Sequence, residues 1–337
     1  MASTSAPVIE PSTVLRHQSA IFPAMAMLAG MQLDLFTPLK EGPLTAAEIA
    51  AAIGVKPPKL VPLLYALVVA ELLTVEGDRF SNTPEAATYL VAGSPSYLRG
   101  RQEFLADIWP ALLQTAATIR ANAPQAKHDF YAMSQDEMGA FFRGQHLGAV
   151  MAGEHLGAVH AFSRFRHLLD VGGGSGGVAI GACRVCPGLM ATVADLPRIT
   201  PVTQQFLEEA RVVDRVSTLV ADVVAEPPNA NYDVAVMRNL IQVLSLEHAG
   251  AALRNVVQSL TPGGPLFIVG NMLDDSRLSP PVLVGQNLVF INIYDDGLIY
   301  AEGEYRALLV DAGFVDVTVQ QAGMPGGQAL IWARKPG

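Results

Sequence analysis

The chain has 337 residues, with 22 lysine and arginine against 31 aspartate and glutamate residues, and a formal net charge of −9. This length is sufficient for two domains with separate cores. An acidic chain is a poor partner for a phosphate backbone, so we expect no nucleic-acid ligand. Half of the residues are hydrophobic and the mean hydropathy is +0.32, which indicates either a membrane protein or extra apolar surface buried against a partner.

The longest apolar run is "AIFPAMAMLAGMQLDLF", at residues 20–36. Pro23, Gln32 and Asp34 interrupt it, whereas a membrane-spanning helix needs about 20 consecutive apolar residues. We therefore expect a buried helix at a homodimer interface and no membrane segment. The first residues, "MASTSAPVIEPS", lack the basic and apolar regions of a secretory signal. Two cysteines do not form a disulfide framework, and the simplest location is the cytoplasm.

Residues 1–160 are predicted to form a helical, Ala-rich first domain. Within it, Thr45 and Glu48 have the spacing of a capping box at a helix start, and Gly54 can end that helix. A second helix and two short strands around Gly77-Asp78 complete a winged helix-turn-helix pattern. Residues 44–90 carry three basic and five acidic side chains. Because a DNA-reading face should be basic, we favour a role in dimerisation over DNA binding.

The helices expected at 100–160 link the two halves of the chain. They carry Tyr131, Arg143 and His146, which either roof a substrate cleft or belong to ordinary amphipathic helices. The histidines have no clear metal-ligand spacing, so we expect no metal. The pair Cys183 and Cys186 is a lone CxxC, which indicates a redox pair, half of a zinc site, or two small apolar residues one turn apart on a helix.

Residues 161–337 alternate between strands and helices, which predicts an α/β domain with a doubly wound sheet. The last two strands are close in sequence, with "GMPGG" between them, and should form an antiparallel hairpin at the sheet edge. The expected strands are 167–172, 190–196, 216–222, 232–237, 264–272, 316–322 and 328–335.

The segment "LLDVGGGSGGVAI" carries the main chemical signal, because a strand runs through glycines into a helix. Gly172, Gly174 and Gly177 fit G-x-G-x-x-G, a spacing that also suits dinucleotides. Asp170 precedes the glycines, and Asp195 ends the second strand, where an acid can accept hydrogen bonds from ribose hydroxyls. Asp222 ends the third strand, within reach of an adenine amino group.

Together with "ADLP", "ADVV" and "VMRNLIQVLS", this segment resembles the class I S-adenosylmethionine-dependent methyltransferases. The closer resemblance is to the caffeate, hydroxyindole and phenazine O-methyltransferases, and it covers nearly the whole chain. It implies a Rossmann-like catalytic domain, a winged-helix dimerisation domain and S-adenosylmethionine as the methyl donor. By this resemblance Gly172 and Gly174 cradle the methionine part of the cofactor, Asp195 holds the ribose, and Asp222 and Val223 hold the adenine. The full set of cofactor-binding residues that it implies is Asp170, Gly172, Gly174, Asp195, Leu196, Asp222, Val223 and Arg238.

One part of the family pattern is missing. The family motif runs to a histidine, the general base, followed by Asp-Trp, whereas this chain has Gln242 followed by Val243 and Leu244. Two glutamates usually orient that histidine, and Asn271 and Ile299 fall at their positions. A phenol has a pKa of about 10, so its methylation benefits from a base. A thioether sulfur has no proton to lose and needs none.

The missing base therefore favours S-methylation of a small thioether hydroxy acid, 4-methylthio-2-hydroxybutyrate, as in dimethylsulfoniopropionate synthesis. Gln242 then hydrogen-bonds the acceptor or shapes its pocket. Tyr131, Arg143 and His146 are the candidates for holding a carboxylate. Asn287, Phe290 and Tyr294 recur at helical spacing and share one face, which lines either the core or the pocket.

Three alternatives remain open at this point. The first is methylation of oxygen, or of carbon or nitrogen, in a small hydroxylated aromatic, with His146 or water as the base. The second is a winged-helix regulator with a vestigial cofactor fold. The third is a cofactor-binding protein that no longer transfers methyl groups.

Overall fold

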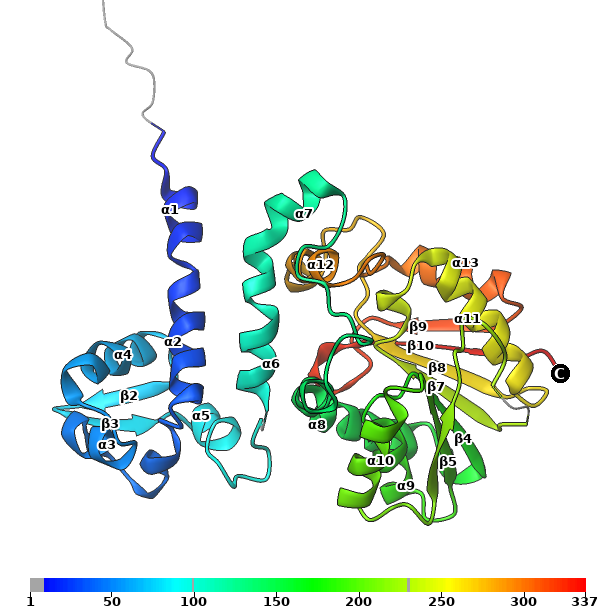
Figure 1. Ribbon diagram of the computed structural model, residues 1–337, viewed down its shortest axis with the longest axis horizontal. Helices are drawn as coiled ribbons and strands as arrows, with labels where there is room; N and C mark the ends of the chain where they lie inside the picture. Colours follow the sequence, from blue (N-terminus) through cyan, green and yellow to red (C-terminus); the bar gives the residue numbers. More distant parts are fainter. Residues whose placement is uncertain (1–8, 99, 229–230) are drawn as a thin grey trace, which may run out of the picture. The chain divides into compact units, whose positions relative to one another are not determined.

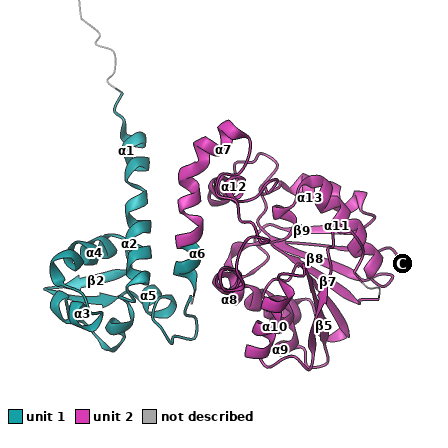
Figure 2. Ribbon diagram, viewed as in Figure 1, with its two compact units in different colours: residues 1–105 teal, residues 106–337 magenta. Residues whose placement is uncertain are grey.

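The computed structural model describes residues 9–98, 100–228 and 231–337 of the chain. The chain divides into two compact units, Met1–Leu105 and Ala106–Gly337 (Figure 2). The expected domain boundary at 160/161 lies further along the chain than this division. The reason is the long helix α8 (Gln135–Val159), which packs along α9 (Gly177–Val185) and so belongs with the second unit.

The first unit contains the expected winged-helix elements. The Thr45–Glu48 capping box is present, with the Glu48 N–H donating to Thr45 Oγ1 over 3.3 Å, and Gly54 follows the helix with φ +70°. The three strands pair in the order β1-β3-β2. The elements are α1 (Ser12–Ser19), α2 (Ile21–Gln32), η1 (Thr37–Glu41), β1 (Leu44–Thr45), α3 (Ala46–Ala52), α4 (Pro57–Val69), β2 (Leu73–Glu76), β3 (Arg79–Asn82) and α5 (Pro84–Tyr89).

The apolar run at 20–36 forms α2 and the turn after it. Ala26, Gly30 and Met31 face the core of this unit, but Phe22 is 66% exposed. The helix is therefore buried on one side only within a single chain. Among the described residues, no single helix has the length and apolar character to cross a membrane, and only the bent pair α3 and α4 reaches that threshold when joined.

The second unit is built around a seven-stranded sheet with the order β6-β5-β4-β7-β8-β10-β9 (Figure 1). The first five strands in this order run parallel, and β10 is antiparallel to both of its neighbours, which confirms the expected hairpin at the edge. The strands are β4 (His167–Val171), β5 (Met190–Asp195), β6 (Val216–Val220), β7 (Val234–Arg238), β8 (Pro265–Gly270), β9 (Val315–Gln320) and β10 (Ala329–Arg334).

Helices cover both faces of this sheet, which is why its central strands are almost continuously apolar. One face packs against α8 and α9, and the other against α11 (Leu246–Ser259) and α13 (Glu302–Asp311). The remaining helices are α6 (Arg101–Ile108), which spans the division between the units, η2 (Pro110–Gln114), α7 (Thr115–Ala121), η3 (Phe162–Arg164), α10 (Thr200–Glu209), η4 (Ile241–Val243), α12 (Pro281–Ile293) and η5 (Pro325–Gly327).

Glycines let α8 and α9 approach until their backbones touch. A Cβ atom at Gly153 would lie 2.1 Å from the carbonyl oxygen of Val178, and one at Gly181 would lie 2.1 Å from that of Val150. Such distances are far below van der Waals contact, so both positions exclude any side chain. This crossing fixes α8 over the start of α9, which is also the end of the glycine-rich loop.

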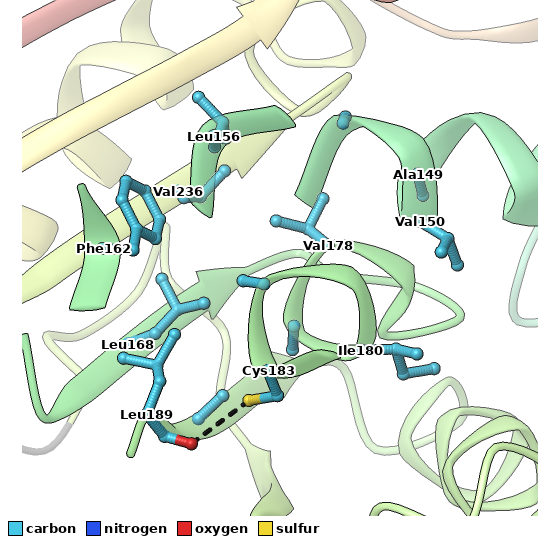
Figure 3. Packing of buried hydrophobic residues seen from close by; sticks show 14 of the residues in the cluster. Ala149, Val150, Leu156, Phe162, Leu168, Val178, Ile180, Cys183, Leu189 and Val236 are labelled. Atoms are coloured by element: carbon cyan, nitrogen blue, oxygen red, sulfur yellow. Dashed lines mark hydrogen bonds between the residues drawn. The ribbon is translucent and has the colours of Figure 1, made fainter. Parts of the chain in front are cut away.

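The CxxC pair lies in the same apolar layer. Cys183 and Cys186 are both free and buried, and the Cys183 thiol donates to the carbonyl oxygen of Leu189 over 3.4 Å (Figure 3). Burial raises the pKa of Cys183 to about 11 and also raises that of Cys186. Thiols of this kind are poor nucleophiles and poor metal ligands, so the pair acts as small apolar core residues.

Candidate functional site

The glycine-rich loop joins the carboxyl end of β4 to the start of α9. Gly172 and Gly174 have φ of +60° and +56°, the left-handed region that glycine enters without strain. A Cβ at Gly174 would also lie 2.6 Å from the ring of Phe142 on α8. The loop is therefore a tight backbone turn closed on one side by an aromatic ring, at the sheet edge where α/β folds bind ligands.

Asp170, next to last in β4, and Arg238, the last residue of β7, lie at the carboxyl ends of neighbouring strands. Asp170 is fully buried, and its Oδ2 accepts from the Ala179 N–H over 3.1 Å. Burial raises the pKa of Asp170 to about 7, and burial lowers the pKa of Arg238 to about 10. Asp170 Oδ1 and Arg238 Nε have no hydrogen-bond partner among the described residues. Unsatisfied buried polar atoms of opposite character suit a polar ligand at this point.

Asp195 ties the glycine-rich loop to the end of β5. Its Oδ2 accepts from the Gly174 N–H and its Oδ1 from the Leu196 N–H, both over 2.8 Å. Burial raises its pKa to about 6, while the two backbone donors oppose that shift. Each carboxylate oxygen has a second lone pair, which is the kind of acceptor that a ribose hydroxyl requires.

The expected adenine residues follow β6, next to β5 in the sheet. Asp222 is exposed, and its Oδ1 accepts from the Val224 N–H over 3.0 Å. Val223 is buried beside the face of the sheet that packs against α11. An exposed carboxylate beside an apolar side chain fits the amino group and the flat face of a purine.

His146 is engaged with the glycine-rich loop. Its Nδ1 lies 2.9 Å from the Ser175 hydroxyl, and its ring packs on Phe206 with centroids 4.7 Å apart. Burial, with smaller contributions from Arg143 and Arg184, lowers its pKa to about 4. His146 is thus a weak base, and one of its two ring nitrogens already has a partner.

The other two candidates on the linking segment are Arg143 and Tyr131. Arg143 makes two hydrogen bonds of 2.9 Å to Glu209, and its guanidinium lies 4.6 Å from the centre of the Phe206 ring. Tyr131 is 65% exposed. Arg143 and His146 therefore already have partners within the protein, namely Glu209, Phe206 and Ser175.

Gln242, at the position of the expected base, is buried in a network of amides. Its Oε1 accepts from the backbone N–H of Asn271 over 3.0 Å, and its Nε2 donates to Asn239 Oδ1 over 3.4 Å. Gln328 donates to the same oxygen over 2.9 Å, and Asn271 Nδ2 donates to Gln286 over 3.2 Å. These five amide side chains contain no group that can take a proton near neutral pH.

The residues of the proposed helical face, Asn287, Phe290 and Tyr294, make different contacts. Asn287 Oδ1 accepts from the backbone N–H of Ile299 over 2.7 Å, so it fastens the following loop. Phe290 and Ile299 are buried in one apolar cluster with Leu273. Tyr294 packs against the same cluster, with its ring centre 5.6 Å from that of Phe290, and it also lines a cavity.

That cavity contains groups that the sequence analysis did not identify. It has a volume of about 220 Å³ and lies beside the segment that follows Gln242. His128 in its wall lies beside Asp107, with Nε2 and Oδ2 3.1 Å apart. The two residues are 21 positions apart and on no common element, so no local spacing could reveal the pair. The lining residues are Lys127, His128, Val243, Leu244, Ser245, His248, Ile293, Tyr294, Asp295 and Asp296.

In the described part of the chain, no three His, Cys, Asp or Glu side chains are grouped so that they could hold a metal ion. The polar groups of the site instead suit an organic ligand with a charged amino-acid end and a ribose.

Known proteins agree with this geometry. The O-methyltransferase domain family matches residues 122–315, and the O-methyltransferase dimerisation domain family matches residues 15–92. The tetracenomycin polyketide synthesis 8-O-methyl transferase of Streptomyces glaucescens is 30% identical over 334 residues, which is 97% of each chain. The N,N-dimethyltransferase OxyT of Streptomyces rimosus is 27% identical over 98% of each chain.

The fold is shared with solved structures as well. Human N-acetylserotonin methyltransferase, in complex with S-adenosylmethionine, superposes with a TM-score of 0.84 over 100% of both chains at 22% identity. The family matches, the full-length relative and the glycine-rich loop lead to one conclusion. The chain belongs to the O-methyltransferase family and is an S-adenosylmethionine-dependent methyltransferase with a dimerisation domain.

Proposed function

We propose that this enzyme methylates an acceptor atom that has no proton to lose, and that the acceptor is the thioether sulfur of a small hydroxy acid. The observation that carries this proposal is the environment of Gln242. The position of the family's base holds an amide whose oxygen is used by the Asn271 N–H. The surrounding side chains are amides too, so the site has no base machinery there.

The proton balance of the reaction favours sulfur. S-adenosylmethionine, when bound, supplies an electrophilic methyl group. The acceptor's thioether sulfur would form the new S–C bond with a lone pair while the methyl–sulfur bond of the cofactor breaks and S-adenosylhomocysteine leaves. The positive charge then moves to the acceptor sulfur, so no proton has to leave. The protein then contributes positioning and the exclusion of water. The proposed acceptor is 4-methylthio-2-hydroxybutyrate, as in dimethylsulfoniopropionate synthesis, and the proposed form is a cytoplasmic homodimer.

Transfer to the oxygen of a hydroxylated aromatic is the second candidate. It is favoured by the name of the relative from Streptomyces glaucescens, an 8-O-methyl transferase. It requires a base other than Gln242. His146 is unsuited, because its pKa is lowered to about 4 and its Nδ1 contacts Ser175. Nitrogen is a variant of this candidate, since the relative from Streptomyces rimosus is an N,N-dimethyltransferase.

A transfer assay separates the two candidates. The enzyme is incubated with methyl-labelled S-adenosylmethionine and either 4-methylthio-2-hydroxybutyrate, catechol or a hydroxyindole at equal concentrations. Label in a sulfonium product, with little in the phenols, supports the proposal. Label in the phenols alone overturns it and shifts the search to another base.

A further inference from the structure

His128 is held in one position by three contacts within the second unit. Its Nε2 lies 3.1 Å from Oδ2 of Asp107, and its ring meets Phe141 edge to face with centroids 5.4 Å apart. Its backbone N–H donates to the carbonyl oxygen of Ile293 over 2.9 Å, which fastens this loop to the end of α12. The imidazole is therefore oriented by a carboxylate and packed against an aromatic ring.

These contacts decide where the ring carries its hydrogen. Burial lowers the pKa of His128, and the Asp107 carboxylate opposes the shift only in part. The ring is thus neutral near pH 7 and has a single N–H. Because a carboxylate can only accept, that hydrogen lies on Nε2, and Nδ1 presents a lone pair.

Among the described residues, no donor forms a hydrogen bond to this lone pair. His128 is 9% exposed, and its Nδ1 is closed off from solvent without a hydrogen-bond partner among the described residues. A buried acceptor without a hydrogen-bond donor destabilises a folded protein. Such an atom is therefore a candidate to accept a hydrogen bond from a bound ligand.

The surroundings of His128 suit a small polar ligand. The residue shares the wall of the 220 Å³ cavity with Tyr294 and with Val243, which directly follows Gln242. Burial, and then the Asp107 charge, raise the pKa of Tyr294, so its hydroxyl stays neutral. The cavity thus adjoins the segment where the family's base would stand. Its wall combines the neutral groups of His128 and Tyr294 with the ion pair of Lys127 and Asp295.

We propose that Asp107 and His128 recognise the methyl acceptor, with His128 Nδ1 accepting a hydrogen bond from a hydroxyl group away from the atom that is methylated. This inference rests on the proposed function and adds the feature that selects a hydroxy acid over its deoxy counterpart. His128 contacts the acceptor. Asp107 is a positioning residue, because it holds the hydrogen on Nε2 and leaves Nδ1 free to accept.

The test compares two acceptors that differ in one group, 4-methylthio-2-hydroxybutyrate and 4-methylthiobutyrate. The variant His128→Phe keeps a ring beside Phe141 and removes the acceptor atom. We expect its KM for the hydroxy acid to rise by about 10-fold, the usual effect of one lost hydrogen bond, with kcat and the KM for the deoxy acid little changed. His128→Asn retains an acceptor near Nδ1 and should recover part of the loss.

Two further variants complete the design. Asp107→Asn releases the constraint on the hydrogen of the ring, and its KM for the hydroxy acid should rise several-fold. His167→Phe is the matched control, because His167 is exposed at the opposite end of β4 from the glycine-rich loop. It should change neither KM nor kcat, and thermal unfolding checks that all variants are folded.

The outcomes that overturn the inference are distinct from those that overturn the proposed function. An equal rise in KM for both acids assigns His128 a structural role only, and a loss of kcat without a change in KM assigns it a role as base. If neither acid is methylated, the proposed function fails. The inference is then judged by titration calorimetry of both acids into the enzyme loaded with S-adenosylhomocysteine. Selective loss of hydroxy-acid binding in His128→Phe supports it, and equal or absent binding of the two acids overturns it.

Discussion

Replacing Gln242 by leucine separates a structural role of this residue from a catalytic one. The side chain is only 3% exposed, and its Oε1 is the acceptor for the Asn271 backbone N–H over 3.0 Å. Leucine has a similar volume but cannot accept, so Gln242→Leu leaves that part-buried N–H without its acceptor. The cost of such a group is about 1–3 kcal/mol. Its bond to Asn239 is long, at 3.4 Å, and adds little.

The expected result is a less stable enzyme that still turns over. For a unit of this size, a loss of 1–3 kcal/mol lowers Tm by roughly 2–10 °C, measured by scanning calorimetry. Because no proton passes through Gln242 in the proposed reaction, kcat for the thioether should fall by less than about 10-fold, whereas loss of a general catalyst is worth about 10²–10⁴-fold. A fall of 100-fold or more, with an unchanged Tm, would refute this reasoning. The exposed Gln258 on α11 provides the control. The free energy of unfolding of Gln258→Leu should stay within about 0.5 kcal/mol of the wild-type value.

Four other predictions follow from named contacts. Asp195→Ala removes the acceptor of the Gly174 and Leu196 N–H groups and should abolish S-adenosylmethionine binding in titration calorimetry; unchanged affinity would contradict the assignment. Gly181→Ala places a Cβ 2.1 Å from the Val150 carbonyl oxygen and should destabilise the enzyme by more than about 1–3 kcal/mol in urea unfolding. Gln242→His alone should not confer methylation of catechol, because the orienting positions hold Asn271 and Ile299. The pKa of His146 falls from 6.5 to about 4 in the folded state, so folding disfavours its protonation; relative to His146→Asn, wild-type stability should be full above pH 6.5 and decline as the pH falls towards 4.

Much of the second unit could be predicted because its signals are local. Apolar runs of five or six residues, separated by helical segments and followed by glycine or aspartate, identify buried parallel strands and their ligand-binding ends. All seven expected strands are present, with ends shifted by one or two residues. Asp170 and Asp195 could be found in the same way, because each lies at the carboxyl end of a strand.

The cavity could not be predicted, because it depends on contacts between distant segments. Asp107 lies at the end of α6, His128 in a loop and Tyr294 after α12, and only the tertiary fold brings them together. The same limit applies to Arg143. Its neighbours in the sequence suggest a cation that is free to bind a carboxylate ligand, whereas in the structure it is paired with Glu209 from α10. Side chains on one helix face can be identified from spacing, but their partners on another helix cannot.

The domain boundary illustrates a further limit. The change from helical to alternating composition near residue 160 is real, yet the structural division falls at Leu105. The helix α8 has the composition of the first half but packs on α9 through Gly153 and Gly181. Small residues at a helix crossing carry little signal in the sequence of either helix alone.

The pH dependence of kcat tests the central claim most directly. With both S-adenosylmethionine and 4-methylthio-2-hydroxybutyrate saturating, kcat is measured from pH 6 to pH 9. If a thioether is methylated without a general base, a sulfonium product forms and kcat does not rise with pH. A rise in kcat with pH is what the deprotonation of a catalytic base would produce. A tenfold rise in kcat per pH unit at the acidic end, or turnover of phenols alone, would contradict the account.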